Sequence, residues 1–331
     1  MSEAKKKRDW PSVALGLAVS LICLAILARL INLQKLVDSL RYADARFLLI
    51  ASLLSLVWLL VRGIAWRMLL QGQARYRHVF FTLNEGYLLN NVLPLRLGEI
   101  GRGFLLDKKS GLGFWRILPT IVIERLLDLV LAVSLVLFSL PFVINIAWAK
   151  ESALVTGGIV LAGLGFLFVL ARFREKAETL YKNAGSRWPI LLKIGQKPVT
   201  AFLTGLAVLK DPGAFLRAIL VFTINWLAAV IQYFVLMKAF FPEARPIWAV
   251  FCLGVAALGA AAPSLPGGVL VYEAVVMGAL ALFTQDASRS AAFAIFNHFL
   301  NYFITGILGG YALFKDGESL SSLYRKTKLI R

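Results

Sequence analysis

Long runs of apolar residues recur along this sequence and constrain its fold more than any other feature. A helix rises 1.5 Å per residue, so about 20 apolar residues cross the hydrocarbon core of a bilayer. Six runs approach or exceed this length, at residues 11–28, 47–61, 117–146, 153–171, 214–237 and 291–314. Of the 331 residues, 59% are hydrophobic and 16% are charged, whereas soluble domains carry about a quarter charged residues. The sequence therefore predicts an all-α, polytopic helical membrane protein with a single integral membrane domain over residues 1–331.

Basic residues are unevenly distributed between the apolar runs, and this asymmetry predicts the orientation of the chain. The formal net charge is +18, and 28 of the 36 Lys and Arg residues fall in one alternating set of segments. That set comprises residues 1–10, 62–79, 96–125, 172–217 and 315–331. Cytoplasmic loops carry such an excess under the positive-inside rule. We therefore expect cytoplasmic tails at 1–10 and 315–331 and a basic cytoplasmic loop at 172–213, in the plasma (inner) membrane of a bacterium or archaeon.

The distribution of charge and the few reactive side chains also limit the partners of the protein. The basic residues are scattered over many loops without a nucleic-acid-binding module, so we expect attraction to anionic lipid and no nucleic acid. Cys23 and Cys252 lie within apolar runs, and His78 and His298 have no companion at metal-ligand spacing. The sequence therefore predicts no disulfide framework, no metal and no cofactor.

The predicted orientation requires two segments to enter and leave the membrane on the same side. Residues 80–104 would begin and end in the cytoplasm, and residues 247–284 would begin and end outside. The breaks in these segments are Pro94 and Gly98 in the first and Pro263 and Pro266 in the second. Non-helical backbone at membrane depth must be buried in protein or line a wet cavity. We therefore predict two re-entrant helical hairpins whose tips border a central cavity.

The two hairpins divide the chain into halves of opposite orientation. Residues 47–146 contain an inward span, a hairpin from the cytoplasm and an outward span, whereas residues 214–314 contain the same elements with every direction reversed. Interrupted segments at matching places in two inverted halves indicate the central site of a transporter. The alternative is that both segments are ordinary proline-kinked spans that form no repeat.

Charged residues beside the first break form a candidate binding site. The stretch "PLRLGEIGR" carries Arg96, Glu99 and Arg102. A guanidinium binds two phosphate oxygens at once, and the N-terminus of a helix after Pro94 would add partial positive charge. Glu99 is three residues from both arginines and could neutralise them in an empty site or bind a cationic headgroup. The alternative is that these groups pair only with each other and hold the hairpin shut.

A second group of charges lies in "IVIERLLDLVL". Glu124 and Asp128 are four residues apart, on one face of a helix, and Arg125 is adjacent to Glu124. Paired carboxylates inside a membrane can serve as a general acid and base or as a proton relay. Because arginines lie nearby in the sequence, a structural ion-pair network is an equal alternative.

Further candidates for the cavity lining come from both hairpins. Asn90 and Asn91 lie shortly before the first break, and this spacing alone makes them candidates. In the second hairpin, Gly267 and Gly268 permit a tight turn and a close approach of the backbone to a ligand. Glu273 follows two helical turns along. We include these five residues in the predicted substrate-binding site.

These motifs together resemble a known family. The matching residues are Pro94, Arg96, Gly98, Glu99 and Arg102 in "PLRLGEIGR", Glu124, Arg125 and Asp128 in "ERLLD", and Glu273 after "PSLPGG". They resemble the signatures of the flippase-like membrane domain of lysylphosphatidylglycerol synthases, over about residues 11–314. The resemblance implies a lipid flippase with two re-entrant hairpins in inverted halves. Leu270 departs from the family, which often has glycine there, and no aminoacyl-transferase domain follows residue 331. We therefore expect a free-standing member whose substrate need not be an aminoacyl lipid.

The leading functional prediction is a flippase, and not an enzyme, that moves a polar or glycosylated lipid through the central cavity. The expected partners are membrane lipids (anionic phospholipid, aminoacyl lipid or glycolipid), and assembly into a homo-oligomer stays open. One alternative is a secondary transporter of a small solute, whose cavity would be sealed from lipid. The other is a membrane-embedded enzyme that uses Glu124 and Asp128 on a headgroup, although the sequence supplies no nucleophile and base at a suitable spacing.

Overall fold

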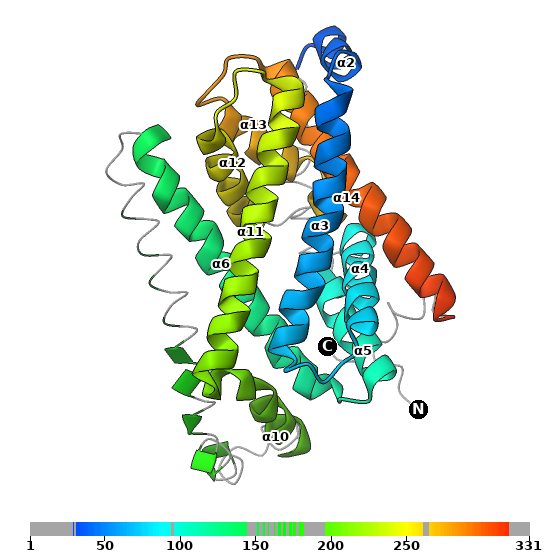
Figure 1. Cartoon of the computed structure of the whole chain (residues 1–331), viewed down its shortest axis with the longest axis vertical. Helices are drawn as coiled ribbons and strands as arrows, with labels where there is room; N and C mark the ends of the chain where they lie inside the picture. The colour runs from blue at the N-terminus through cyan, green and yellow to red at the C-terminus, as the bar shows by residue number, and fades with distance from the viewer. Residues whose placement is uncertain are drawn as a thin grey trace, which may run out of the picture.

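The four longest helices of the protein are long and apolar enough to cross a membrane. A computed structural model describes residues 31–93, 96–143, 196–260 and 265–317, with position 29 and scattered positions between 151 and 181. The long helices are α3 (Ala45–Leu69), α6 (Phe114–Val143), α11 (Pro212–Phe240) and α14 (Ala287–Lys315), shown in Figure 1. No strand occurs within the described ranges. The prediction of an all-α, polytopic helical membrane protein is confirmed, while the predicted run 11–28 lies outside the described residues.

Three of the long helices begin at an aspartate that caps them. The side chains of Asp44, Asp211 and Asp286 accept hydrogen bonds from backbone N–H groups in the first turns of α3, α11 and α14. Such caps satisfy N–H groups that have no partner inside the helix. Pro212, directly after Asp211, occupies the first turn of α11, where its fixed φ suits a helix start. Local sequence therefore sets where these helices begin.

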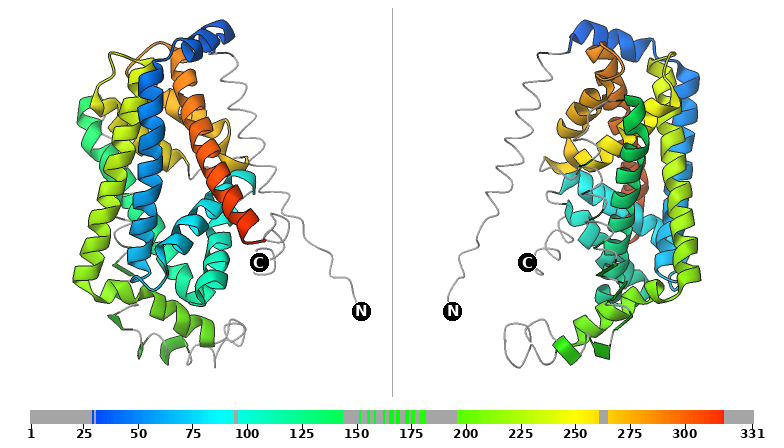
Figure 2. Two further views of the ribbon diagram at one scale, coloured as in Figure 1. Left: turned by 45° about the vertical axis from the view of Figure 1, so that its right-hand side comes forward. Right: turned by 90° about the vertical axis from the view of Figure 1, so that its left-hand side faces the viewer.

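Two pairs of shorter helices occupy opposite halves of the bundle. The first pair is α4 (Tyr76–Val92) and α5 (Leu97–Ser110), and the second is α12 (Pro246–Gly259) and α13 (Val271–Leu280), with the 3-10 turn η3 (Pro266–Gly268) between its helices. Each pair runs to the middle of the bundle and turns back toward the end where it began (Figures 1 and 2). We call them the first and the second hairpin. At the two ends of the bundle lie α2 (Leu33–Arg41), and α10 (Gln196–Gly205) with η2 (Leu206–Lys210).

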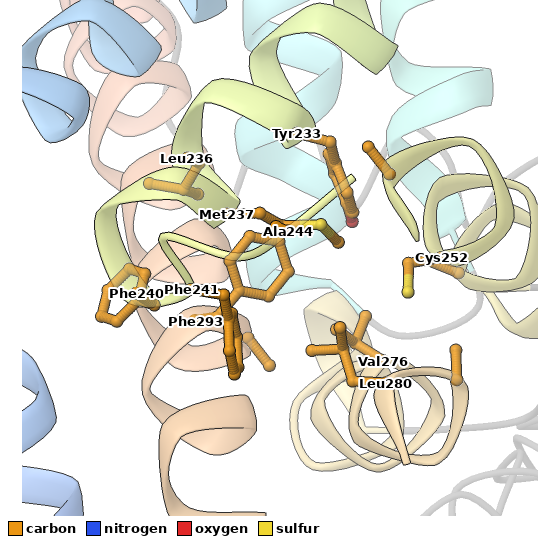
Figure 3. Close-up of a cluster of buried hydrophobic side chains, with 14 of the residues drawn as sticks. Tyr233, Leu236, Met237, Phe240, Phe241, Ala244, Cys252, Val276, Leu280 and Phe293 are labelled. Carbon is orange, nitrogen blue, oxygen red and sulfur yellow. The ribbon is translucent and has the colours of Figure 1, made fainter. Parts of the chain in front are cut away.

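Two buried apolar clusters hold the bundle together. The cluster in Figure 3 joins α11 to the second hairpin and α14, and includes Tyr233, Phe241 and Phe293. The other cluster lies at the opposite end, around Trp66 and Phe222. The outer face of α3 instead exposes large apolar side chains every three or four residues, at Leu49, Leu53, Leu56 and Leu60. A helix with an apolar outer face of this kind is stable against lipid, so the exposed faces support an integral membrane protein.

One predicted boundary is wrong in a way that affects the interior. The apolar run at residues 47–61 predicts a span that ends at residue 61, with residues 62–79 in the cytoplasm, whereas α3 continues to Leu69. Arg62 therefore lies inside a helix, with 3% of its surface exposed. A guanidinium is stable there because carboxylates from another helix neutralise it, as the ion pairs of Arg62 show.

Candidate functional site

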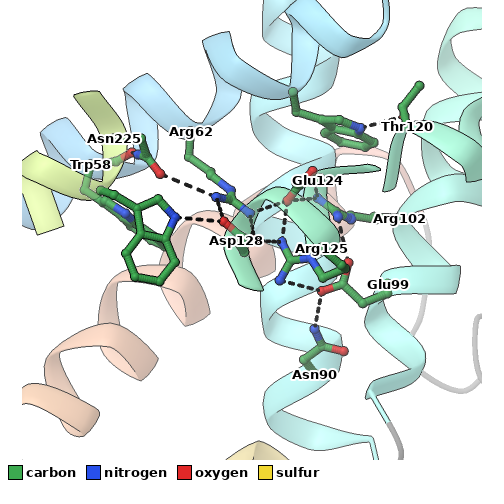
Figure 4. A network of polar contacts seen from close by, with 12 residues as sticks. Trp58, Arg62, Asn90, Glu99, Arg102, Thr120, Glu124, Arg125, Asp128 and Asn225 are labelled. Atoms are coloured by element: carbon green, nitrogen blue, oxygen red, sulfur yellow. Dashed lines mark hydrogen bonds and ion pairs between the residues drawn. The ribbon is translucent and has the colours of Figure 1, made fainter. Parts of the chain in front are cut away.

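Arg62 on α3 holds two carboxylates of α6 at the centre of a polar network (Figure 4). Its Nη2 lies 2.6 Å from Oε1 of Glu124 and 2.5 Å from Oδ2 of Asp128, and its Nη1 donates to Oδ1 of Asp128 at 2.6 Å. The indole of Trp226 also donates to Asp128, at 3.0 Å, and Asn225 lies 3.5 Å from the guanidinium. Arg62 therefore fastens α3 to α6, and α11 contributes the two neighbouring polar groups.

Arg102 connects the first hairpin to the same carboxylates. Its Nη2 lies 2.6 Å from Oε2 of Glu99, and its Nη1 lies 3.1 Å from Oε2 of Glu124. The guanidinium carbon is 4.5 Å from the ring centre of Trp66, a distance at which a cation is attracted to the face of an aromatic ring. Asn90 on α4 adds a weak hydrogen bond to Glu99 at 3.4 Å. The hairpin is thus tied to the long helices by buried charges.

Arg125 completes a network in which positive and negative charges balance. Its guanidinium contacts Glu124 and lies 3.6 Å from Glu99 and 3.2 Å from Asp128. The network contains three arginines and three acids, namely Arg62, Arg102, Arg125, Glu99, Glu124 and Asp128. Charges inside a membrane are tolerated when they are paired, and unpaired ones are strongly unfavourable. Arg125 is 35% exposed whereas Glu124 is fully buried, so the network extends from the interior to the surface at Arg125.

Arg96, which we predicted to contact phosphate, lies outside this network. It caps the start of α5 with φ 52° and is exposed, and its guanidinium donates to the backbone carbonyl of Ala260, beside the end of α12. Among the described residues Arg96 forms no ion pair. Asn91, another predicted site residue, donates to Thr305 on α14 at 3.2 Å. At the tip of the first hairpin, no described carboxylate therefore neutralises the charge of Arg96 by direct contact.

Close packing of glycines fixes the geometry of the first hairpin. A side chain at Gly98 would overlap the carbonyl oxygen of Gly86 on α4 and would also meet the side chain of Asn90. The absence of a side chain at Gly98 therefore lets α5 lie directly against α4, which positions Glu99 and Arg102 toward α6. Pro94, the predicted break of this hairpin, lies outside the described residues.

The turn of the second hairpin depends on residues with positive φ. Gly267 and Gly268 have φ of 73° and 80°, which glycine adopts without strain, and Leu270 has φ 70°. Glu273 stabilises the Leu270 conformation because its Oε2 accepts a hydrogen bond from the Leu270 N–H at 2.7 Å. The other oxygen, Oε1, lies 2.6 Å from Nδ1 of His298 on α14. The predicted residues Gly267, Gly268 and Glu273 thus form one turn, whereas the predicted break Pro263 lies outside the described residues.

A third charged group joins the first hairpin to the end of α14. Lys109 Nζ lies 2.8 Å from Oε2 of Glu85 and also contacts Asp316. Glu85 is completely buried, and Lys109 is its described cationic partner. The lysine therefore connects α4, α5 and the residue after α14.

Two residues that join these sites were not predicted from the sequence. The distribution of Lys and Arg predicts a cytoplasmic loop at Arg62, although the apolar stretch that follows this residue indicates a longer helix. His298 was considered only as a metal ligand, whereas its described partners are a carboxylate and a backbone carbonyl. Neither partner has a fixed spacing in the sequence that could have revealed the contact.

Comparison with known proteins places this architecture in a family. The chain is 20% identical over 328 residues to a UPF0104 membrane protein of Methanothermobacter thermautotrophicus, covering 93% of this chain and 96% of that protein. It is 27% identical over 228 residues to a UPF0104 membrane protein of Methanocaldococcus jannaschii, covering 67% of this chain and 91% of that protein. Residues 13–309 match the family described as the lysylphosphatidylglycerol synthase TM region. The chain therefore belongs to the family of the lysylphosphatidylglycerol synthase transmembrane region.

Proposed function

We propose that this protein is a flippase that carries a lipid with an anionic, phosphate-containing headgroup past the tips of its two hairpins. The single observation that carries the proposal is the position of Arg96. This arginine lies where the first hairpin meets the second, and among the described residues it is neutralised by no direct carboxylate contact. A guanidinium near the middle of a membrane protein is unfavourable without a partner. A phosphate would supply that partner with two oxygens at once.

The proposal treats both hairpins as re-entrant and the two halves of the chain as inverted repeats. The packing of the helices supports this interpretation, because α6 packs against α12 in the second hairpin as α14 packs against α4 in the first. The long helices α3 and α11, one from each half, lie side by side. Transporters with inverted halves place their substrate sites between interrupted helices near the bilayer midplane. By the distribution of Lys and Arg, the end of the bundle with α10 faces the cytoplasm, as do both termini, in a bacterial or archaeal inner membrane.

An apolar cavity beside the charged network suits the acyl chains of such a lipid. It has a volume of about 370 Å³ and lies between α6 and α11, where Leu127, Leu131 and Phe222 line it. Leu127 adjoins Asp128 in the sequence, and the Phe222 ring lies 5.0 Å from the guanidinium carbon of Arg62. A flippase must let the headgroup cross polar surroundings while the chains stay in apolar ones, and here both surroundings are adjacent.

The ion pairs of Glu124 and Asp128 argue against the enzyme alternative. Glu124 and Asp128 each contact two or more arginines, so neither carboxylate has the freedom to exchange a proton with a headgroup. An acid held by several cations stays ionised and acts as a structural anion. We therefore assign the network to bracing the first hairpin.

The test is lipid movement in vesicles that contain the purified protein. We expect transfer of a fluorescent phosphatidylglycerol between leaflets to slow in Arg96→Lys, which keeps the charge but loses the planar fork. Transfer should slow further in Arg96→Ala, by about 10- to 100-fold, the equivalent of one charge-assisted hydrogen bond. The control is Arg75→Ala, an exposed arginine between α3 and α4. If Arg96→Ala transfers lipid at the rate of the parent protein, Arg96 does not bind the headgroup and the proposal is wrong.

A further inference from the structure

His298 links α14 to the turn of the second hairpin through both of its ring nitrogens. Its Nδ1 lies 2.6 Å from Oε1 of Glu273, and its Nε2 lies 3.1 Å from the backbone carbonyl of Gly267. Both partners belong to the second hairpin, one on α13 and the other in η3. The histidine and the glutamate side chains are only 12% and 11% exposed. The imidazole is therefore the described side chain that fastens this turn to the long helix.

The number of protons on this pair decides how many of its two contacts can form. A backbone carbonyl only accepts hydrogen bonds, so the Gly267 contact requires a proton on Nε2 of His298. A hydrogen bond between Nδ1 and Glu273 then needs a second proton, whichever of the two atoms holds it. A neutral histidine beside an ionised glutamate carries one proton, so its other ring nitrogen directs a lone pair at an oxygen that also only accepts. One of the two contacts is then repulsive. Both contacts form together only when the pair has bound one additional proton and is electrically neutral.

Few other charged groups could compensate for loss of that proton. The titratable groups that face the pair are Tyr272 on α13 and Tyr302 on α14, whose rings lie 4.6 and 4.5 Å from the imidazole. Behind Tyr272 lie Tyr233 on α11 and Cys252 on α12. Across the second hairpin, the described cation Arg96 contacts the carbonyl of Ala260. In the part of the chain that the structure describes, the only ion pair of Glu273 is with His298.

The turn that His298 holds lies between the two hairpins. A side chain at Gly267 would overlap the Tyr302 hydroxyl and would lie 3.3 Å from the backbone oxygen of Asn91 on α4. The Tyr302 hydroxyl is buried and has no hydrogen-bond partner among the described residues. A displacement of this turn would therefore move it away from Tyr302 on α14 and from the end of α4, where the two hairpins meet.

We propose that the Glu273–His298 pair is a proton-binding site that couples lipid movement to protonation. With the proton bound, both contacts form and the turn is fastened to α14. When the proton leaves, the pair has a net charge of −1 and one contact is lost, so the turn is released. With a proton gradient across the membrane, the turn would be fastened when the pair is open to the more acidic side and released when the pair is open to the other side. This inference rests on the proposed lipid transport, although the proton site itself can be observed without it.

The proton site can be observed directly because the chain has only two histidines, His78 and His298. In the His78→Gln variant, the ring nitrogen signals of ¹⁵N-labelled histidine report on His298 alone. Between about pH 5 and 9, we expect one titration step, from a state with both nitrogens hydrogen-bonded to a state with a single N–H. Glu273→Gln should change these signals, because the Nδ1 atom loses its carboxylate partner. A ring that keeps one protonation state over the whole range would overturn the proton site.

Coupling is tested in vesicles with and without an imposed pH gradient. We expect the gradient to change the rate of phosphatidylglycerol transfer about fivefold or more, at the lower end of typical couplings between two ligands. His78→Gln should respond like the parent protein, and Glu273→Gln and His298→Gln should not respond. Transfer that occurs but ignores the gradient in the parent protein overturns the coupling and leaves the proposed function intact. If the parent protein transfers no lipid, the proposed function and its coupling fail together, and the nitrogen signals still decide whether the proton site exists.

Discussion

Replacement of Arg62 by methionine should destabilise the protein more than removal of any single exposed charge. Arg62→Met removes three short hydrogen bonds, of 2.5–2.6 Å, to Glu124 and Asp128. The network then holds three acids and two arginines, a net charge of −1. Because Glu124 is fully buried, water cannot replace the lost partner. Removal of one member of a buried pair typically lowers the free energy of unfolding by about 3–5 kcal/mol, and we expect a loss of this size.

A second substitution that restores neutrality should recover part of this loss. Asp128→Asn alone leaves an excess of one positive charge and should also be destabilising. Combined with Arg62→Met, it leaves two arginines and two acids. The double variant should therefore be more stable than the sum of the single effects predicts, by about 1–3 kcal/mol, as found for residues in one polar network.

The assay is equilibrium unfolding of the four proteins of this cycle in detergent micelles. Arg67→Met is the matched control, because Arg67 lies on the same helix, is exposed and, among the described residues, donates to the carbonyl of Ala74 at 3.0 Å without an ion pair. We expect the control to lose less than about 1 kcal/mol, as is usual for exposed groups. Additive effects of Arg62→Met and Asp128→Asn would refute the charge-balance argument, because they would show that the two residues stabilise the protein independently.

Two further predictions concern the packing of the first hairpin. Gly98→Ala should reduce thermal stability in detergent, because the new methyl group overlaps the carbonyl oxygen of Gly86. The cost of this overlap should exceed the gain in helix propensity of about 1 kcal/mol. Gly278→Ala, where no described atom lies within 4 Å, should not reduce stability, and equal stability of the two variants would contradict this packing. Lys109→Met should also lower the melting temperature by leaving the buried Glu85 carboxylate unpaired, and Lys109→Arg should recover part of the loss; a melting temperature unchanged in Lys109→Met would show that Glu85 needs no cation.

The sequence predicts the helical class and much of the charged network because those signals are local. Glu99 and Arg102 are three residues apart, and Glu124 and Asp128 are four residues apart, so helical geometry alone places each pair on one face. A structural ion-pair network is one of the alternatives that the sequence leaves open, and the structure contains the local pairs Glu99–Arg102 and Arg125–Asp128. The inverted repeat and the re-entrant hairpins stay predictions, since they concern a membrane.

Contacts between distant helices could not be predicted in the same way. Arg62 follows an apolar run, and an arginine directly after such a run is typical of a cytoplasmic loop. Its partners, Glu124 and Asp128, are more than sixty residues away in the sequence. The contact of Arg96 with Ala260 likewise joins the two hairpins over a separation of 164 residues. A single sequence contains no signal for such pairs, because local helix geometry does not set their spacing.

The two hairpins are held by different kinds of contact, and this difference indicates which of them moves. The first is fixed by ion pairs of Arg102 and Lys109 with buried carboxylates, and withdrawal of this hairpin would separate opposite charges in the interior. The second is joined to its neighbours through hydroxyl and amide groups, such as those of Tyr272 and Asn297, and through the His298 ring. Neutral hydrogen bonds can be exchanged one at a time, whereas a buried charge cannot be separated from its partner gradually. For the proposed lipid transport, we therefore expect the second hairpin to move against a fixed first one.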